Sequence, residues 1–164
     1  MNKRAQRWID RLGLNEHPEG GWYKETFRAE TQVESRESPA RIRAASTNIY
    51  FLLVQGRPSR LHRIKSDEIW HFFEGAPIRV HVIDRVGDYQ SMTLGPDWEA
   101  GQRYQYVVPA GSWFGASVDE PGAFALVGCT VAPGFDFVDF ELADRAGLSA
   151  MYPNHQQIID QLTP

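Results

Sequence analysis

The chain has 164 residues, a formal net charge of −4, and 42% hydrophobic and 12% aromatic residues. This composition excludes a disordered or coiled-coil protein and predicts a single globular domain over residues 1–164. Because there is neither a basic stripe nor an apolar run of about 20 residues, no nucleic-acid partner and no membrane span are expected. The lone Cys129 excludes an internal disulfide and, with a basic N-terminus that lacks a following apolar stretch, predicts a cytoplasmic location.

The N-terminal segment has the pattern of a helix followed by a turn. A helix is predicted before Gly13, which ends it, because four apolar residues recur at helical spacing: Ala5, Trp8, Ile9 and Leu12. This helix is expected to pack on the rest of the domain. Gly20 and Gly21 predict positive φ angles or a close backbone approach. The side chains of His17 and Glu19 in the same turn are expected to be solvated, with contact to a ligand at the rim of a site as the alternative.

A first strand is predicted from Trp22 to Phe27, and the polar segment AETQVESRESPARIRA, residues 29–44, predicts a long surface loop because it has no sustained period. From residue 46, β-branched and aromatic segments alternate with turn signals about every ten residues, as in an all-β sandwich or barrel. In the strand IRVHVID, His81 is expected to point away from the apolar face. A last helix is predicted after Pro153, on the spacing of His155, Ile158, Ile159 and Leu162.

The stretch GRPSRLHRIKSDEIWHFFEG resembles the first sequence motif of the cupin superfamily. Four residues fall in the register of its pattern, G-x5-H-x-H-x3,4-E-x6-G: Gly56, His62, Glu68 and Gly75. Ile64 stands at the second histidine position, or, if His62 is the second histidine, Arg60 stands at the first. One imidazole of the motif is therefore absent in either alignment.

The second cupin motif, G-x5-P-x-G-x2-H-x3-N, is also incomplete. The segment PAGSWFGASV supplies Pro109 and Gly111, but Phe114 replaces the histidine and Val118 replaces the asparagine. Six blocks, running in order from about residue 14 to the C-terminus, resemble a cupin_5-like subfamily described as a domain of unknown function: HPEGGWYKETFR, NIYFLL, HRIKSDEIWHFFEG, VPAGSWFGA, LVGCTVAPGFDFVDFELA and YPNH.

This resemblance implies an all-β fold, a cupin-like double-stranded β-helix or jelly-roll barrel with short flanking α-helices at both termini. Such folds often pair through exposed strands, so a homodimer is expected. The mouth of the barrel should hold a small polar ligand such as a sugar or a nucleotide-linked sugar. The fold alone does not determine the chemistry.

A metal-loaded cupin usually offers three histidines and one glutamate to the ion. In this chain only His62 and Glu68 stand at matching positions, because Phe114 and Ile64 have no lone pair to donate. His71 joins them only through a bulge, since strand residues three apart point to opposite faces. We therefore expect no metal and no other cofactor, with a metal-dependent cupin enzyme as the disfavoured alternative.

Metal-free chemistry is the favoured interpretation of the same residues. Strand alternation places Arg60 beside His62, and a neighbouring cation and burial both keep an imidazole neutral and able to accept a proton. Glu68 is expected to orient His62 or to pair with Arg60, which otherwise clamps a phosphate or carboxylate. Three tyrosines on neighbouring strands are candidate acids: Tyr50, Tyr104 and Tyr106. The segment SRLH resembles a feature of metal-free sugar-nucleotide 3,5-epimerases.

Two functional classes remain open: a metal-free epimerase or isomerase with His62 as its base, and a protein that binds a metabolite without turnover. Sugar rings stack on aromatic faces, although most aromatic residues in such a fold form the core. The candidate ligand contacts besides Arg60 are Trp70, His71, Trp113, Phe114 and Asp136.

Overall fold

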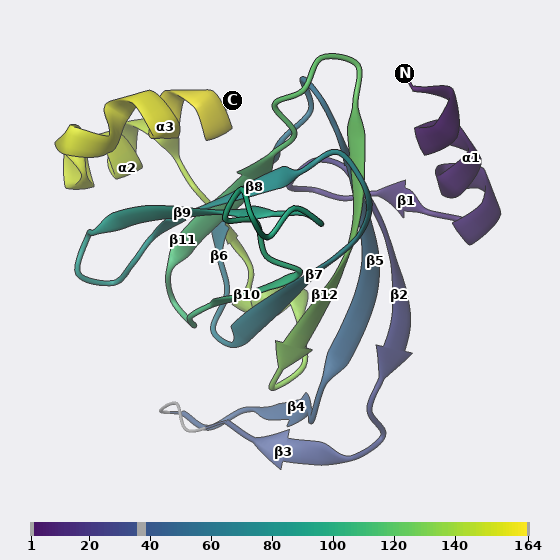
Figure 1. Cartoon of the computed structure of the whole chain (residues 1–164). Helices are drawn as coiled ribbons and strands as arrows, with labels where there is room; N and C mark the ends of the chain where they lie inside the picture. Colours follow the sequence, from purple (N-terminus) through teal and green to yellow (C-terminus); the bar gives the residue numbers. More distant parts are fainter. Residues whose placement is uncertain (1, 36–38, 164) are drawn as a thin grey trace.

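The computed structural model describes residues 2–35 and 39–163, and two β-sheets form the body of the fold (Figure 1). The six-stranded sheet has the order β1-β2-β5-β12-β7-β10, and its strands are β1 (Asn15–Glu16), β2 (Trp22–Arg28), β5 (Thr47–Val54), β12 (Phe124–Ala132), β7 (Asp67–Gly75) and β10 (Gln105–Val108). The five-stranded sheet has the order β13-β6-β11-β8-β9, and its strands are β13 (Glu141–Leu142), β6 (Ser59–Arg63), β11 (Trp113–Ser117), β8 (Ile78–Ile83) and β9 (Tyr89–Leu94).

The two sheets do not close into one barrel. Strands β1 and β10 are the ends of one sheet, and β13 and β9 are the ends of the other. The prediction of a mostly β fold with flanking helices is confirmed, whereas the closed barrel is not found. Short edge strands of two and four residues limit the length over which each open edge of the six-stranded sheet presents unpaired backbone groups.

A short hairpin occupies much of the segment that was predicted to be a long loop. It consists of β3 (Gln32–Glu34) and β4 (Ile42–Ala44), paired antiparallel. Positions 36–38 of the predicted loop lie outside the described residues. The loop prediction was wrong at these strands because both are polar and only three residues long, so they have no readable period.

The predicted N-terminal helix is confirmed as α1 (Lys3–Leu12). The side chain of Asn2 caps it by accepting hydrogen bonds from the backbone N–H groups of Arg4 and Ala5, and Gly13 ends it with a φ of 63°. Ala5 and Ile9 are buried in a cluster with residues of β2, β5 and β12, so α1 covers one side of the six-stranded sheet.

The C-terminal segment covers the outer face of the five-stranded sheet. It contains α2 (Arg145–Met151), η2 (Pro153–His155) and α3 (Gln156–Leu162), of which only the last two were predicted. Their apolar side chains share a buried cluster with the sheet, formed by Leu61, Ile83, Trp113, Leu148, Ile158, Ile159 and Leu162. His81 lies on this outer face as expected, yet it is buried, with Nδ1 2.8 Å from the Tyr89 hydroxyl.

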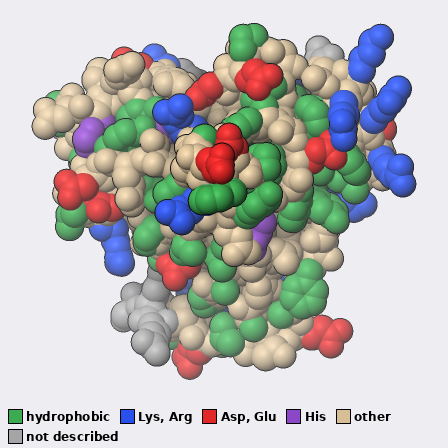
Figure 2. Space-filling model, in the orientation of Figure 1, with side chains coloured by type: hydrophobic (Ala, Val, Ile, Leu, Met, Phe, Trp, Pro, Cys, Tyr) green, Lys and Arg blue, Asp and Glu red, His purple; other side chains and the backbone are tan. Residues whose placement is uncertain are grey.

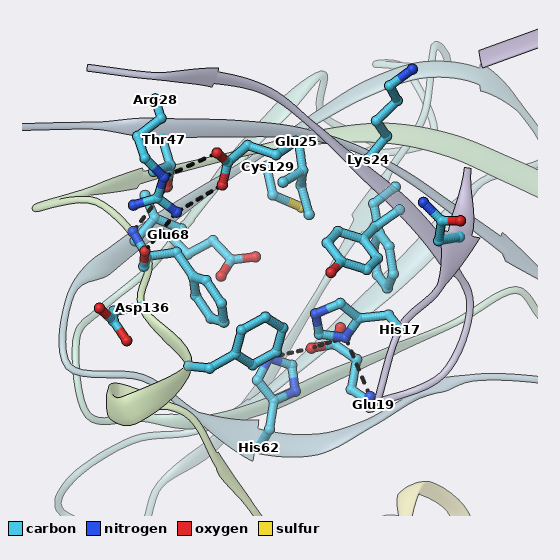
Figure 3. A pocket seen from close by; sticks show the side chains of 17 residues that line it. His17, Glu19, Lys24, Glu25, Arg28, Thr47, His62, Glu68, Cys129 and Asp136 are labelled. Carbon is cyan, nitrogen blue, oxygen red and sulfur yellow. Dashed lines mark hydrogen bonds and ion pairs between the residues drawn. The ribbon is translucent and has the colours of Figure 1, made fainter. Parts of the chain in front are cut away.

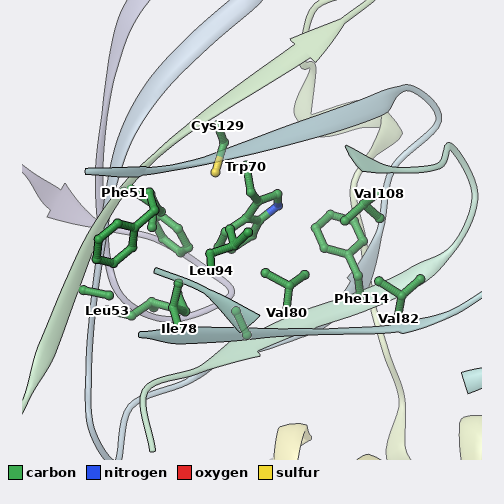
Figure 4. Packing of buried hydrophobic residues seen from close by; sticks show 14 of the residues in the cluster. Phe51, Leu53, Trp70, Ile78, Val80, Val82, Leu94, Val108, Phe114 and Cys129 are labelled. Atoms are coloured by element: carbon green, nitrogen blue, oxygen red, sulfur yellow. The ribbon is translucent and has the colours of Figure 1, made fainter. Parts of the chain in front are cut away.

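The main core lies between the sheets (Figure 4). One sheet supplies Phe51, Trp70 and Cys129, and the other supplies Val80 and Phe114, all of them almost completely buried. Each large apolar side chain buried in this way stabilises the fold by roughly 1.5–3 kcal/mol. The core fills only part of the space between the sheets, and the remainder is a cavity. Among the described residues, no helix has the length and apolar character that crossing a membrane requires.

Candidate functional site

A cavity of about 390 Å³ lies beside the core (Figure 3). Residues of β2, β5, β7 and β12 line it from one sheet, His62 lines it from β6 in the other sheet, and the loops before β2 and after β12 complete it. Its volume is at the lower end of the range of about 300–1,000 Å³ found for small-molecule sites. Titratable groups and a thiol line it, among them His17, Glu19, Glu25, His62, Glu68 and Cys129.

The carboxyl group of Glu19 is the centre of a buried hydrogen-bonded array. Its Oε2 lies 3.2 Å from Nε2 of His62 and 3.4 Å from Nδ1 of His17. Its Oε1 accepts a hydrogen bond of 2.7 Å from the hydroxyl of Ser59. Glu19 is 6% exposed and His62 is 2% exposed, so the array is shielded from bulk water.

Fixed backbone partners determine where the protons of this array lie. His62 Nδ1 is 2.7 Å from the carbonyl oxygen of Arg60, and because a carbonyl only accepts, Nδ1 carries the hydrogen and Nε2 presents a lone pair to Glu19. The backbone N–H of Glu19 donates to His17 Nδ1 at 3.3 Å, so neutral His17 carries its hydrogen on Nε2, which faces the cavity (Figure 3). Glu19 Oε2 therefore faces two hydrogen-bond acceptors, His17 Nδ1 and His62 Nε2. One proton on Oε2 lets the carboxyl group donate a hydrogen bond to either of them.

Burial favours the neutral form of all three groups. It lowers the pKa of His62 to about 4, opposed by the hydrogen bond to the Arg60 carbonyl. Burial also lowers the pKa of His17 and raises the pKa of Glu19. These directions agree with the hydrogen-bond geometry, in which two uncharged imidazoles face one proton on the Glu19 carboxyl.

A β-bulge brings Ser59 and His62 to the same carboxyl group. Their partners on β11 are Ala116 and Phe114, so three steps along β6 oppose two steps along β11. Residues three apart on a regular strand point to opposite faces, and the extra residue cancels this alternation. Gly115 makes room for the bulge, because a Cβ there would lie 2.6 Å from the carbonyl oxygen of Ser59.

Two glycines hold the loop with His17 and Glu19 against the sheets. Gly20 has a φ of 113°, and a Cβ on it would lie 2.4 Å from the carbonyl oxygen of Pro58. Gly21 has a φ of 69°. The prediction of positive φ angles and a close backbone approach is confirmed. The prediction that the side chains of His17 and Glu19 are solvated was wrong, because both side chains turn inward and line the cavity.

Glu68 faces the same cavity from β7, across from His17 (Figure 3). It is 7% exposed, and among the described residues no cation lies within ion-pair distance of its carboxyl. Burial raises the pKa of Glu68 to about 8; the nearby Glu19 carboxyl adds to the shift and a hydrogen bond from the Cys129 thiol opposes it. A carboxyl with this pKa is mostly protonated at neutral pH, and its ionised form is a stronger base than an ordinary carboxylate.

Aromatic rings surround the imidazole of His17. Phe137, in the segment after β12, stacks on it with ring centroids 5.9 Å apart and an angle of 24° between the planes. Tyr23 from β2 meets it edge-on at 4.5 Å, and Phe51 and Phe140 are within 6.0 Å. Tyr23, Phe51 and Phe137 give this wall of the cavity an aromatic lining.

The segment with Phe137 is tied to the β3–β4 hairpin through Asp139. The Asp139 carboxylate accepts hydrogen bonds between 2.6 and 2.9 Å long from Arg41 and Arg43. The hydrogen bond from Arg43 is the largest cause of the lowered pKa of Asp139. The hairpin missed by the sequence pattern therefore positions one wall of the site.

Three of the predicted site residues line the cavity: His62, Glu68 and Asp136. Asp136 uses its carboxylate to cap η1 (Phe137–Asp139), accepting from the Val138 N–H at 2.9 Å, and it points away from the interior (Figure 3). The β-bulge turns Arg60 outward, where its guanidinium donates to the backbone carbonyls of Pro18 and Glu19. Arg60 is therefore not an anion clamp inside this cavity.

The candidate acids Tyr50 and Tyr106 do not line the cavity. Tyr50 packs into the cluster beneath α1, on the outer side of the six-stranded sheet, and Tyr106 packs against the main core. Tyr104 is 58% exposed. Successive side chains of a strand point to opposite faces of the sheet, and the sequence alone did not show which face of each strand lines the interior.

The remaining predicted ligand contacts belong to the core or to the outer faces. Trp70 and Phe114 are 0% and 1% exposed and pack inside the core. Trp113 lies beneath the C-terminal helices. His71 lies outside the cavity lining, with Nε2 2.9 Å from the Thr130 hydroxyl.

The residues present do not fit the metal site usual in cupins. Ile64 and Phe114, at the positions of the other histidines, lie in the apolar core, and the Phe114 ring packs on His62 with centroids 4.1 Å apart. In residues 2–35 and 39–163, no three His, Cys, Asp or Glu side chains are grouped so that they hold a metal. The neighbours of His62 are a carboxyl, a backbone carbonyl and two aromatic rings.

Several solved structures are similar to this chain. A hypothetical protein from Leishmania major is 40% identical with a TM-score of 0.91, over 97% of this chain and 98% of that one. The protein SO0799 from Shewanella oneidensis is 38% identical with a TM-score of 0.88, over 100% and 98% of the two chains. Oxalate decarboxylase from Bacillus subtilis, at 17% identity and a TM-score of 0.54 over 91% of this chain and 37% of that one, shares the fold alone.

Sequence comparison identifies the family. The uncharacterized protein YML079W of Saccharomyces cerevisiae is 29% identical over 145 residues, which are 82% of this chain and 72% of that protein. Residues 6–143 match the family Cupin_5, described as Cupin superfamily (DUF985). With the two-sheet fold and the partial cupin motifs, this match shows that the chain belongs to the Cupin_5 family.

Proposed function

We propose that this chain binds a small metabolite in the cavity between the sheets and catalyses proton transfer on it without a metal, as an epimerase or isomerase. Glu68 is the base, and His17 is the acid. Glu19 and His62 are positioning residues: Glu19 supplies a proton to His17, and His62 holds the Glu19 carboxyl in place.

One observation carries the proposal: Glu19 Oε2 lies between Nδ1 of His17 and Nε2 of His62, at 3.4 and 3.2 Å. A proton on this oxygen can move to either imidazole. Both nitrogens of His62 face protein groups, so His62 acts on a ligand only through Glu19. This role replaces the direct base that the sequence suggested for His62.

The proposed reaction proceeds next to a carbonyl group. The Glu68 carboxylate takes a proton from the carbon beside the carbonyl, while His17 Nε2–H gives its proton to the carbonyl oxygen. Glu19 Oε2–H gives its proton to His17 Nδ1, and the hydroxyl of Ser59 donates to the resulting carboxylate. An isomer forms when Glu68 gives the proton to the former carbonyl carbon and the hydroxyl on the carbon that lost its hydrogen passes its proton to His17 Nε2, while His17 Nδ1 returns its proton to Glu19. An epimer forms when the planar intermediate turns over before Glu68 returns the proton to the same carbon, and the former carbonyl oxygen then gives its proton back to His17.

Deuterium exchange tests this function without knowledge of the product. The protein is incubated in D2O with a panel of aldoses, ketoses and 2-hydroxy ketones, and proton NMR follows loss of the signal from the carbon beside the carbonyl. We expect exchange on at least one compound, with a rate that rises with pH until about pH 8, where Glu68 becomes ionised.

Variants separate catalysis from binding. Glu68→Gln and His17→Asn should each slow exchange by at least about 100-fold, and Glu19→Gln should also change the pH profile, since it removes the shared proton. Glu74→Gln, on the outer side beside Trp8, is the matched control. Compounds that bind without any exchange would instead support the alternative, a binding protein without turnover.

A further inference from the structure

If the cavity is the ligand site, as proposed above, the charges around it indicate which ligands it accepts. Two cationic residues line it, Lys24 and Arg28. Each is already engaged by the protein.

Lys24 directs its ammonium group away from the cavity (Figure 3). Its Nζ donates to the carbonyl oxygen of Leu12 at 3.1 Å, at the end of α1, where a cation interacts favourably with the helix dipole. Other basic residues gather on the outside: Figure 2 shows Lys and Arg side chains over α1, whose sequence contains Lys3, Arg4, Arg7 and Arg11.

Arg28 is neutralised by Glu25, which precedes it by three residues on β2. Its Nε and Nη2 donate to the two carboxylate oxygens of Glu25 at 3.0 and 2.7 Å, and Nη2 also donates to the carbonyl of Phe135 at 3.1 Å. The hydrogen bonds that Arg28 donates to Glu25 are the largest cause of the raised pKa of Arg28. The pair contributes no net charge to the cavity.

Burial also favours the uncharged forms of the interior groups. It raises the pKa of Glu19, keeps Glu68 mostly protonated at neutral pH with a pKa of about 8, and lowers the pKa values of His17 and His62 so that both imidazoles stay neutral. An anionic ligand would leave water for a space without a free cation among the described lining residues, and that transfer costs several kcal/mol. A phosphate, a carboxylate or a nucleotide diphosphate is therefore disfavoured.

We infer that the cavity takes an uncharged polyhydroxy carbonyl compound of about monosaccharide size, and not a phosphorylated or nucleotide-linked sugar. The cavity volume of about 390 Å³ suits a ligand of this size. Hydroxyl groups match an interior of neutral donors and acceptors, and the rings of Tyr23 and Phe137 suit the apolar face of a sugar. We therefore expect the nucleotide-linked sugar that the sequence left open not to bind.

Calorimetry with matched compounds tests the inference. D-glucose, D-xylose and D-fructose are compared with glucose 6-phosphate, gluconate, glucosamine and UDP-glucose under the same conditions. We expect at least one uncharged sugar to bind, and its charged analogues to bind at least about tenfold more weakly. Equal or tighter binding of a phosphate, an acid, an amine or a nucleotide sugar would overturn the inference, as would binding of none of the uncharged sugars.

A variant tests the charge argument directly. Glu25→Gln removes the partner of Arg28 and should tighten binding of glucose 6-phosphate by about tenfold relative to the unaltered protein, because it provides a free guanidinium. No gain would contradict the neutralised pair as the reason for discrimination. The His17→Asn variant distinguishes the two proposals: it should lose deuterium exchange yet retain sugar binding, so failure of catalysis leaves the ligand class testable.

Discussion

Glu19 Oε2 lies 3.2 Å from His62 Nε2, and the two residues reach this contact from a loop and from a bulged strand. Neither residue faces bulk water. The contact needs the paired glycines that press the loop inward and the bulge that keeps Ser59 and His62 on one face. The site is therefore a consequence of irregular backbone at two places.

Replacing His62 should reduce the sensitivity of stability to acid. Its pKa is about 4 in the folded protein and 6.5 in the unfolded chain, so the unfolded state alone takes up a proton as the pH falls from 6.5 towards 4. Between pH 6.5 and pH 4 the free energy of unfolding of the unaltered protein falls by on the order of 3 kcal/mol because of His62. The His62→Asn variant should not show this decrease. Urea unfolding of both proteins across the window measures the difference; parallel curves would contradict it.

Replacing Glu68 should have the opposite pH dependence. The folded pKa of about 8 exceeds the unfolded value of 4.5, so the unfolded state alone ionises as the pH rises through this window and stability falls. Glu68→Gln removes this loss and should be more stable than the unaltered protein by more than about 1 kcal/mol at pH 8, with a smaller difference near pH 5. A constant difference between the two pH values would show that Glu68 ionises normally.

Gly115→Ala should disrupt the bulge. The added Cβ would lie 2.6 Å from the carbonyl oxygen of Ser59, so backbone has to move. We expect a loss of about 1–3 kcal/mol in the free energy of unfolding and faster amide exchange at Ser59–Arg63. Unchanged exchange in β6 would show that the glycine is not required there.

Asp139→Asn should loosen the aromatic wall. The carboxylate is held by Arg41 and Arg43, and its side chain is 9% exposed. We expect a loss of roughly 2 kcal/mol in the free energy of unfolding and faster amide exchange in residues 134–140, because the segment loses its ionic anchor. Glu141→Gln is the control: its pair with Arg63 is exposed, so its effect should stay within about 0.5 kcal/mol. Equal effects would contradict the anchoring role.

The sequence predicted the fold more completely than the site. The sequence pattern predicted α1, α3 and most strands, because their apolar residues recur at regular spacing. Gly13 marked the end of α1, and turn residues marked the ends of the strands. The β3–β4 hairpin and α2 were missed, since each has little apolar periodicity. The single domain, the homodimer and the cytoplasmic location remain predictions.

At the site, His62 and Glu68 were found from the cupin motif, and both line the cavity. Arg60 was misplaced because one extra residue in β6 reverses the alternation, and bulges leave no reliable mark in a single sequence. His17 and Glu19 were undervalued, although the glycine pair beside them signalled close packing of that turn. The sequence cannot show which distant groups such packing brings together.

The central claim is that one proton, held on Glu19, is shared with two neutral imidazoles. Nitrogen-15 NMR of the protein with labelled histidine measures this most directly. We expect that at neutral pH His62 is protonated on Nδ1 and unprotonated on Nε2, and that it stays so to about pH 5, because its pKa is about 4. A doubly protonated His62 at neutral pH, paired with an ionised Glu19, would contradict it.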